Sequence, residues 1–571
     1  MRQKTPVMLG VLLASLGFST AASAVLTEVP AGTIAGSETW CDDEDTMLLQ
    51  GPVVVTGSLT IEAGCIVRGQ PRDIPFNTPD PGAPGSLQIF RGGTLTAVGT
   101  PSSPIIFTTA AVDTDDDGVP EMTGGSPSLP RKWVLADGEG NFLDDTPATN
   151  PLAPLNTAGD ANVRLWGGIT VAGFAPTNLA NDLGFGTGIG RVEGTAGQLY
   201  GGSTPGDDSG DLAYISLRHA GDEIGAGNEL NGITFAGVGS GTTCDHIEIY
   251  ANQDDGIEWF GGTNDCTNVL LAYIGDDSLD TDQGYTGAIQ NAIVLSPFFE
   301  EDDSDDYGAA SGDRGGELDG DDSPNVVASP VPDVSICNLT IFGNGDVDGG
   351  TNPAVVDEAG NRGFTMRNGF GGTVANSIIV NTTNSLGGAD AVNVTGGGAI
   401  PPCSGVPTPG DRVCGAACGV VGGDEGIEIV ALTVSDSPAV NSCGLEAFAT
   451  GDARVGVGPN IETSAEQLVN EGPFWDPKGT VSNGRGKLMG TLATALNPTP
   501  ISLATDGVDP TLVGCPDATA TYRGAVGTGG VFSDGWSAMS VGGILPEPGA
   551  APSLAAGALL VLGLLRRRNR S

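Results

Sequence analysis

The sequence predicts an all-β fold, a right-handed parallel β-helix with long acidic loop insertions and a short C-terminal transmembrane helix. One short pattern occurs three times, with its central apolar residues spaced by 24 and then 22 positions, at residues 231–235, 255–259 and 277–281. A second β-prone pattern repeats between these segments with spacings of 22 and then 24, at residues 247–249, 269–271 and 293–295. A fixed period of this length, with strands rather than helices, is typical of a solenoid. The alternative is an antiparallel sandwich, which also has regular short strands but does not require two patterns to keep one register.

The cysteine spacing provides a further observation. Cys41 and Cys65 are 24 residues apart, and Cys244 and Cys266 are 22 residues apart, so each pair spans one coil. Neighbouring strands of a parallel sheet lie about 4.8 Å apart, which suits the Cα separation of a disulfide. The sequence therefore predicts two disulfides between consecutive coils. Unpaired buried thiols are the alternative, and they fit an exported protein poorly.

Six more cysteines leave 15 possible pairings; they are Cys337, Cys403, Cys414, Cys418, Cys443 and Cys515. A local bridge among Cys403, Cys414 and Cys418 is favoured because these three lie close together in the sequence. A zinc site is the alternative there, but the two histidines of the chain lie far away in the sequence, and export favours disulfides.

Composition and charge narrow the possible partners. The chain has 571 residues with 92 glycines, 5% aromatic residues and a net charge of −47. Such a surface repels nucleic acid and anionic lipid, and it attracts divalent cations. The alternative reading is that the acidity only keeps an extracellular protein soluble.

The first 24 residues are predicted to be a signal peptide. Arg2 and Lys4 precede an apolar segment, and a small-residue site follows that would be cut between Ala24 and Val25. The mature protein is therefore expected in an oxidising compartment. We expect the β-helix at 25–424, the last coils and a cap at 425–540, and a separate tail at 541–571. Insertions are expected at about 112–162, 298–332 and 383–424.

The first insertion contains a candidate calcium loop. Asp113, Asp115 and Asp117 alternate before a glycine, and Glu121 stands at the ninth position. Gly124 occupies the twelfth position, where an EF-hand has glutamate, so the loop is more similar to the short calcium loops of extracellular repeat proteins. A solvated acidic turn is the alternative.

The tail has three consecutive features. Pro546, Glu547 and Pro548 precede an apolar run at 550–565, and a basic cluster follows at 566–570. The run is short for a membrane span, and the arginines mark a cytoplasmic side. This arrangement resembles the PEP-CTERM sorting signal of Gram-negative bacteria. The resemblance implies an exosortase as a partner, transient contact with the inner membrane, and delivery to the cell envelope, outer surface or exopolysaccharide matrix. An ordinary tail anchor is the alternative.

The body also resembles a family of uncharacterised secreted bacterial proteins with a pectin-lyase-like β-helix. The matching segments are 166–169, 228–232, 254–262, 276–284, 522–525 and 535–536. The resemblance implies the fold and no established activity.

The period also aligns acidic residues. Asp254 precedes Asp276 by 22 residues, Asp255 precedes Asp277, and Glu258 precedes Asp280; Asp282 lies two residues further on. Carboxylates one coil apart repel one another unless a cation or a proton lies between them. The seven acids are therefore predicted to line a cation or saccharide site. We expect Asp254, Asp255, Asp276 and Asp277 as candidate metal ligands, with calcium as the candidate ion.

Catalysis is a further hypothesis. The resemblance to pectin-lyase-like enzymes makes Glu258, Asp280 and Asp282 candidate catalytic groups. However, Arg218 and Arg314 are the nearest basic residues in the sequence, and the Gly-His-Gly and Arg-Ile-Lys motifs of polygalacturonase-like enzymes are absent. These acids also alternate with apolar residues, so they could simply face water. The residues favour an envelope or matrix protein with a structural or adhesive role that could contact extracellular polysaccharide. The alternative is a secreted lyase or glycoside hydrolase acting on acidic polysaccharide.

Overall fold

The computed structural model describes about half of the chain. The described residues are 26–42, 46–72, 82–112, 122–123, 132–133, 163–181, 183–195, 197–225, 228–296, 314–320, 329–330, 332–342, 362–367, 370–380, 392–394, 427–430, 433–435, 441–442, 469–470, 497–500, 509–522, 524–527, 532 and 536–541. The predicted signal peptide, calcium loop and sorting tail lie outside these residues, as do Cys403, Cys414, Cys418 and Cys443. None of the described helices has the length and apolar character that a bilayer crossing requires.

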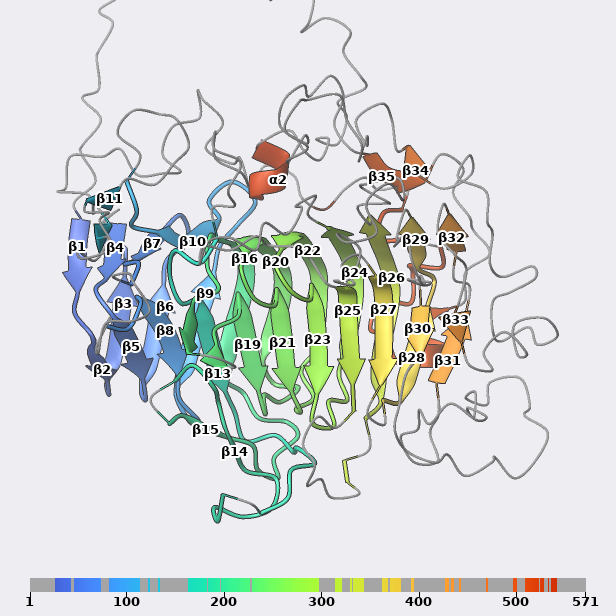
Figure 1. The fold of residues 1–571 in the computed structure, drawn as a ribbon, viewed down its shortest axis with the longest axis horizontal. Coiled ribbons are helices and arrows are strands. Elements are labelled where there is room, and N and C mark those ends of the chain that lie inside the picture. The colour runs from blue at the N-terminus through green and yellow to red at the C-terminus, as the bar shows by residue number, and fades with distance from the viewer. Residues whose placement is uncertain are drawn as a thin grey trace, which may run out of the picture.

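The described chain is almost entirely β, and its two long sheets are parallel (Figure 1). Sheet A has the order β1 (Leu26–Val29), β4 (Thr46–Leu49), β7 (Ile66–Gly69), β10 (Ile105–Thr109), β16 (Gly210–Arg218), β20 (Thr243–Asn252), β22 (Cys266–Ile274), β24 (Ala288–Leu295), β26 (Val334–Phe342), β28 (Gly372–Ala375) and β31 (Ile427–Val430). Sheet B has the order β2 (Gly32–Ile34), β5 (Pro52–Val55), β8 (Ser86–Ile89), β13 (Ile169–Ala172), β19 (Ile233–Ala236), β21 (Ile257–Phe260), β23 (Leu279–Asp282), β25 (Arg314–Asp319), β27 (Arg362–Arg367), β30 (Val392–Val394) and β33 (Asn441–Ser442).

The chain alternates between the two sheets, so each passage adds one strand to each sheet next to the preceding one. This order is consistent with the predicted parallel β-helix. Shorter strands pair beside sheet A; these are β3 (Ser37–Trp40), β6 (Ser58–Ile61), β9 (Thr94–Val98), β29 (Ile378–Val380) and β32 (Thr433–Ser435). Small antiparallel pairs lie in the connections: β11 (Met122–Thr123) with β12 (Lys132–Trp133), β14 (Gly190–Arg191) with β15 (Leu199–Tyr200), β17 (Glu223–Gly225) with β18 (Asn228–Glu229), and β34 (Val469–Asn470) with β35 (Asn497–Pro500).

The register of sheet B follows the first repeat. Ile233 pairs with Ile257, and Ile257 pairs with Leu279, as the 24- and 22-residue spacings predict. In sheet A the register predicted from the second repeat is wrong by one residue at the third segment, residues 293–295. Val269 pairs with Ala292 instead of Ile293, and Ile293 pairs with Leu270. Ala292 therefore takes the inward position, because a shift of one residue moves a side chain to the opposite face of a strand.

A corner within the long strands of sheet A was not predicted. Residues at equivalent positions of six successive strands or strand ends have positive φ angles of 51° to 58°: Tyr214, His246, Asn268, Asn291, Asn338 and Asn376. Asparagine tolerates this left-handed conformation better than most residues do. The corner turns each long strand, so one coil has three straight stretches rather than two.

Inward side chains form one continuous apolar core between the sheets. Within it, the ring centroids of Phe235 and Trp259 lie 6.1 Å apart, and those of Trp259 and Tyr285 lie 5.4 Å apart. Stacked rings from consecutive coils fill the interior where sheet B crosses the middle of the molecule.

Both disulfides expected from one-coil spacing are present. The Cα atoms of Cys41 and Cys65 are 5.5 Å apart, and those of Cys244 and Cys266 are 4.6 Å apart. A third bridge joins Cys337 to Cys515, which is 178 residues later in the chain. The sequence left this pairing open, since nothing in the repeat connects the two positions.

One connection covers the outer face of sheet B. The covering segment, residues 173–202, packs Val192 and Tyr200 against the outward-facing Ala172 and Ala236. The rings of Tyr200 and Phe260 stack at 5.8 Å. Figure 1 shows β14 and β15 of this segment beside β13. Outward side chains of the middle strands are therefore buried under this segment.

Candidate functional site

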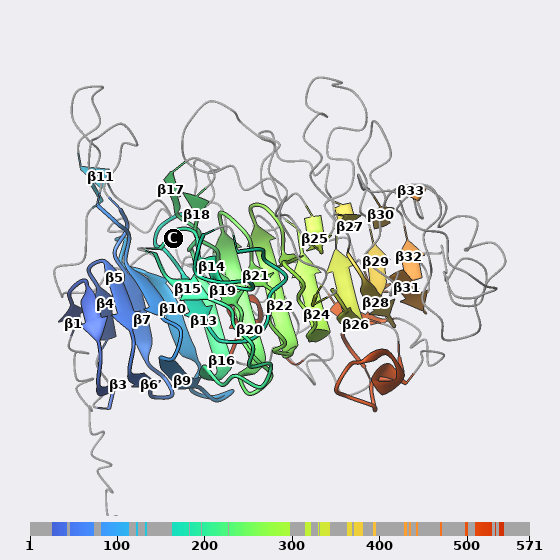
Figure 2. The same cartoon turned by 90° about the horizontal axis from the view of Figure 1, so that it is seen from below.

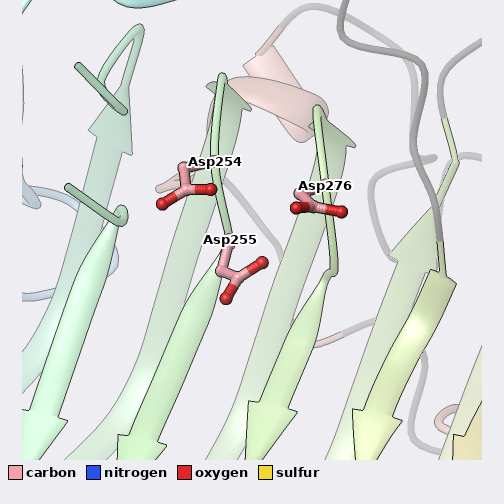
Figure 3. A group of neighbouring side chains, drawn as sticks. All are labelled: Asp254, Asp255 and Asp276. Carbon is pink, nitrogen blue, oxygen red and sulfur yellow. The ribbon is translucent and has the colours of Figure 1, made fainter. Parts of the chain in front are cut away.

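The predicted acids begin at the turns that lead into sheet B. The chain leaves β20, passes through Asp254 and Asp255, and enters β21; one coil later it leaves β22 and passes through Asp276 and Asp277 into β23. Figure 3 shows Asp254 and Asp255 on one turn and Asp276 on the next. The stack brings these turns side by side because the strands on both sides of them are paired.

Hydrogen bonds connect equivalent turn positions of successive coils. The backbone N–H of Asp255 donates to Asn231 Oδ1 at 3.2 Å, and the backbone N–H of Asp277 donates to Asp255 Oδ1 at 3.0 Å. Arg314 continues the row, since its Nη1 lies 2.7 Å from Asp277 Oδ2. The side chains of Asn231 and Asp255 thus each hold the backbone of the following turn, and the Asp277 carboxylate holds the guanidinium of Arg314.

A second row lies on the strands themselves. Thr234 pairs with Glu258, Glu258 with Asp280, and Asp280 with Glu317. Asn231 Nδ2 donates to Glu258 Oε2. Arg314 Nη1 also lies 2.8 Å from Glu317 Oε1, so one guanidinium serves two carboxylates.

The two rows form two groups that could hold a metal ion. Asp254, Asp255 and Asp276 each offer an oxygen within 4.8 Å of the others, and so do Asp255, Asp277 and Asp280. Asp255 belongs to both groups. We call Asp254, Asp255, Glu258, Asp276, Asp277 and Asp280 the acid column.

Burial and mutual repulsion act in the same direction on these groups. Burial, followed by the charge of Asp254, raises the pKa of Asp255 well above its usual range. Burial, followed by the charge of Asp255, does the same to the pKa values of Glu258 and Asp280. For Asp277, burial and Asp276 raise the pKa, and the opposing effect of Arg314 is smaller. One arginine therefore does not neutralise the acid column, which needs protons or a further cation.

Two buried carboxylate oxygens in the column have no hydrogen-bond donor among the described residues. They are Oδ1 of Asp277 and Oδ1 of Asp280. Both atoms are buried, and Asp277 is only 2% exposed. A buried anionic oxygen without a donor is costly unless a cation compensates it. Carboxylate oxygens are the ligands that calcium prefers, so the donor set fits this ion.

Further acids come from parts of the chain that the sequence reading did not connect to the site. Glu193 lies on the covering segment, and burial, followed by the charge of Glu229, raises its pKa to about 7. Gly194 N donates to Asn228 Oδ1 at 2.6 Å, so Glu193 is held beside β18, which contains Glu229. Both acids raise the pKa of Asp254. Docking of a loop brings them together, and no spacing in the sequence signals it.

The candidate catalytic residues Glu258 and Asp282 are buried on sheet B. Glu258 and Asp282 are 7% and 6% exposed, so the expectation that they could face water is wrong. The covering segment buries this face, and Tyr200 from it contributes a hydroxyl that donates to Gln283 Oε1, next to Asp282. Asp282 belongs to neither group of candidate ligands. Asp113, Asp115, Asp117 and Glu121 lie outside the described residues.

Of the two arginines nearest to these acids in the sequence, only one contacts them. Arg314 contacts the acid column, whereas Arg218 Nε donates to Ser216 Oγ at 2.9 Å within β16 of sheet A. Arg164 reaches the edge of the site from another segment, since its Nη2 lies 3.0 Å from Glu223 Oε2. Each of these guanidinium groups is engaged by a neighbouring side chain.

Comparison with known proteins gives one finding for this region. A family model described as a pectate-lyase like beta helix domain matches residues 146–395, which include the acid column and the covering segment. Searches of curated proteins and of solved structures found no match.

Proposed function

We propose that this chain is an exported β-helix protein of the cell envelope or extracellular matrix, with a structural or adhesive role, and that its acid column binds calcium. The observation that carries the proposal is the pair of ligand groups that share Asp255, together with the buried, donor-free oxygens of Asp277 and Asp280. A divalent cation at this place would offset a concentration of negative charge that Arg314 alone does not balance.

Calcium suits the site for chemical reasons. It takes six to eight oxygen ligands in flexible geometry, and the acid column supplies carboxylates from two consecutive turns. The fixed spacing of a parallel stack would hold these ligands in place before the ion binds, which limits the entropy lost on binding. The loop with Asp113, Asp115, Asp117 and Glu121 is a second proposed calcium site.

Export rests on separate observations. The three described disulfides are typical of an oxidising compartment. The predicted signal peptide at 1–24 and the tail around Pro546, Glu547 and Pro548 supply an entry and a sorting step. Under this proposal an exosortase recognises the tail, and the protein passes to the outer surface or the polysaccharide matrix of a Gram-negative cell.

Thermal unfolding with calcium and with EDTA tests the cation site. We expect calcium to raise the unfolding temperature of the wild-type protein, with a stabilisation of about 2.7 kcal/mol at a concentration near 100 times Kd. Asp255→Asn should lose most of this shift, because Asp255 serves both ligand groups. Glu62→Gln, at an exposed position outside the site, should retain it. Equal unfolding temperatures in calcium and EDTA for the wild type would remove the proposal.

An enzyme acting on acidic polysaccharide is the second candidate, and the pectate-lyase-like match favours it. Glu258, whose pKa is raised by burial, would be the proton donor, and Asp280 its partner. A lyase also needs a free base, but the guanidinium of Arg314 is already shared by Asp277 and Glu317. Cleavage of acidic polysaccharide that disappears in Glu258→Gln with Asp280→Asn, while the fold is retained, would establish the enzyme. We expect no cleavage by the wild-type protein.

A further inference from the structure

The described residues near the C-terminus form a strap on sheet A, remote from the acid column in sequence and built from different residues. The strap comprises residues 509–522, 524–527, 532 and 536–541, including η3 (Pro510–Val513) and α2 (Ala538–Val541). It lies beside β28 at η3 and beside β20 at α2. Figure 2 shows the red segment beside β26 and β28, and Figure 1 shows α2 beside β16 and β20. The strap thus runs back along the stack from late coils to central ones.

Side chains of the sheet hold the backbone of the strap. Gln290 Oε1 accepts from the backbone N–H of Asp517 at 2.8 Å, and its Nε2 donates to the carbonyl of the same residue at 3.2 Å. Asn338 Nδ2 donates to the carbonyls of Ala520 and Tyr522 at 2.9 and 2.6 Å. These residues stand on β24 and β26, so consecutive coils present amide groups to one passing segment. In these hydrogen bonds the sheet contributes side chains and the strap contributes its backbone.

The two ends of the strap are fixed by different chemistry. Cys515 is bonded to Cys337 of β26. At the other end, Glu248 of β20 is fully buried, and its two oxygens accept from the backbone N–H groups of Ala538 and Met539 at 2.6 and 2.9 Å. Ser216 Oγ also donates to Glu248, at 2.6 Å.

Aromatic packing reinforces the Glu248 end. Trp536 is 1% exposed, and its ring meets those of Tyr214 and His246 edge-on at centroid distances of 5.8 and 5.9 Å. A buried carboxylate is tolerated only where donors compensate for lost water. Two of the donors to Glu248 belong to the strap, and the charge of Arg218 and the hydroxyl of Ser216 add to their effect, so the strap supplies part of the compensation that this buried acid requires.

We infer that Glu248 is a latch for the C-terminal strap, which couples the coils from β20 to β28 and fixes the chain at the flank of the stack as far as Val541. In a solenoid each coil contacts only its neighbours, so a strap adds a connection that the repeat itself lacks. The segment after Val541 would therefore start from the middle of the flank rather than from the last coil. None of the proposed calcium ligands takes part, so this latch stands or falls independently of the cation site.

Hydrogen–deuterium exchange of the full chain, read by mass spectrometry, tests the latch. Glu248→Gln retains the size of the side chain but has one acceptor oxygen instead of two. The backbone N–H groups of Ala538 and Met539 can then no longer each bond to an oxygen of their own. We expect exchange in 536–541 to accelerate about tenfold or more, while β22 and the segment around Cys515 remain slow. Glu38→Gln, at an exposed position on β3, is the matched control and should change nothing.

A second measurement uses the wild-type protein, so the test does not depend on one variant folding. Mild reduction of the Cys337–Cys515 bond should accelerate exchange in 514–525 and leave 536–541 protected, because Glu248 still holds that end. Unchanged exchange in 536–541 of Glu248→Gln would overturn the inference. Equal acceleration in 536–541 and in β22 would also overturn it, because Glu248 would then support the whole stack and not the strap.

Discussion

At the scale of single residues, Asp255 connects the two ligand groups of the acid column. Its Oδ1 accepts from the backbone of Asp277, its own N–H donates to Asn231, and its carboxylate belongs to both ligand groups. Asp255→Asn removes the charge of this ligand but leaves a side-chain oxygen that can accept from the N–H of Asp277, as Asn231 does for Asp255, so the variant affects the cation site more than the turn.

The raised pKa of Glu193 predicts a dependence of stability on pH in EDTA. The folded state holds this proton up to a pH of about 7, whereas the unfolded carboxyl releases it near 4.5. The free energy of unfolding should therefore fall as pH rises between these values, by roughly 3 kcal/mol from this group. Urea denaturation of the wild type and Glu193→Gln measures the difference. Parallel pH profiles for the two proteins would contradict the prediction.

Gly168 predicts a local steric effect. Its φ is +69°, and an added Cβ would lie 2.1 Å from the carbonyl oxygen of Asn231. Gly168→Ala should cost about 2 to 4 kcal/mol, because the left-handed conformation and the clash act together. Gly36→Ala is the control, since an added Cβ there meets nothing within 4 Å. Equal unfolding free energies for the two variants would contradict the close contact between Gly168 and the carbonyl oxygen of Asn231.

At the scale of elements, the turn between β20 and β21 and the one between β22 and β23 do most of the positioning. The Cys244–Cys266 disulfide joins β20 and β22 near the ends at which these two strands begin, away from the turns. Removing it with Cys244→Ala and Cys266→Ala should cost about 3 kcal/mol, because the closed loop of roughly two dozen residues restricts the unfolded chain. Urea denaturation under oxidising conditions measures this cost, and a loss near zero would indicate that the strands hold the register without the bridge.

The sequence predicts the pairing of these strands correctly where an apolar residue of the repeated pattern is followed by a polar one, so that only the apolar one can face inward. Ile233, Ile257 and Leu279 show the period because each is the apolar residue between a turn and a polar neighbour. The prediction is wrong by one residue at Ile293 because Ala292 and Ile293 are both apolar, so the pattern does not tell which one faces inward. The roles of Glu193 and Glu248 could not be predicted, because each depends on a distant segment docking on an outer face.

At the scale of the whole molecule, net charge sets the response to salt. The chain has a net charge of −47, and many of its acids lie outside the column. Raising salt from about 0.01 M to about 1 M shortens the Debye length from about 30 Å to about 3 Å, so the calcium-free protein should become more stable. Buried acids are screened least, and calcium should therefore still stabilise the protein in high salt. If high salt abolished the stabilisation by calcium, the ion would be bound by exposed surface charges and not by the acid column.

The stack also explains how acids from separate turns form one site, since Asp254 and Asp255 each lie 22 residues before their counterparts Asp276 and Asp277. Turns 22 residues apart become neighbours once β20 pairs with β22 and β21 pairs with β23. The pairing of strands, driven by the apolar core, carries the acids into a position that their own repulsion opposes. A cation relieves this opposition, so fold and ligand are expected to stabilise each other.

The most direct measurement is a calorimetric titration of calcium into the full chain at neutral pH. We predict saturable binding by the wild type, the same binding by Glu62→Gln, and loss of at least one binding event in Asp255→Asn, which shares its carboxylate between two ligand groups. Identical isotherms for Asp255→Asn and the wild type, or no heat of binding in the wild type, would contradict a calcium site in the acid column.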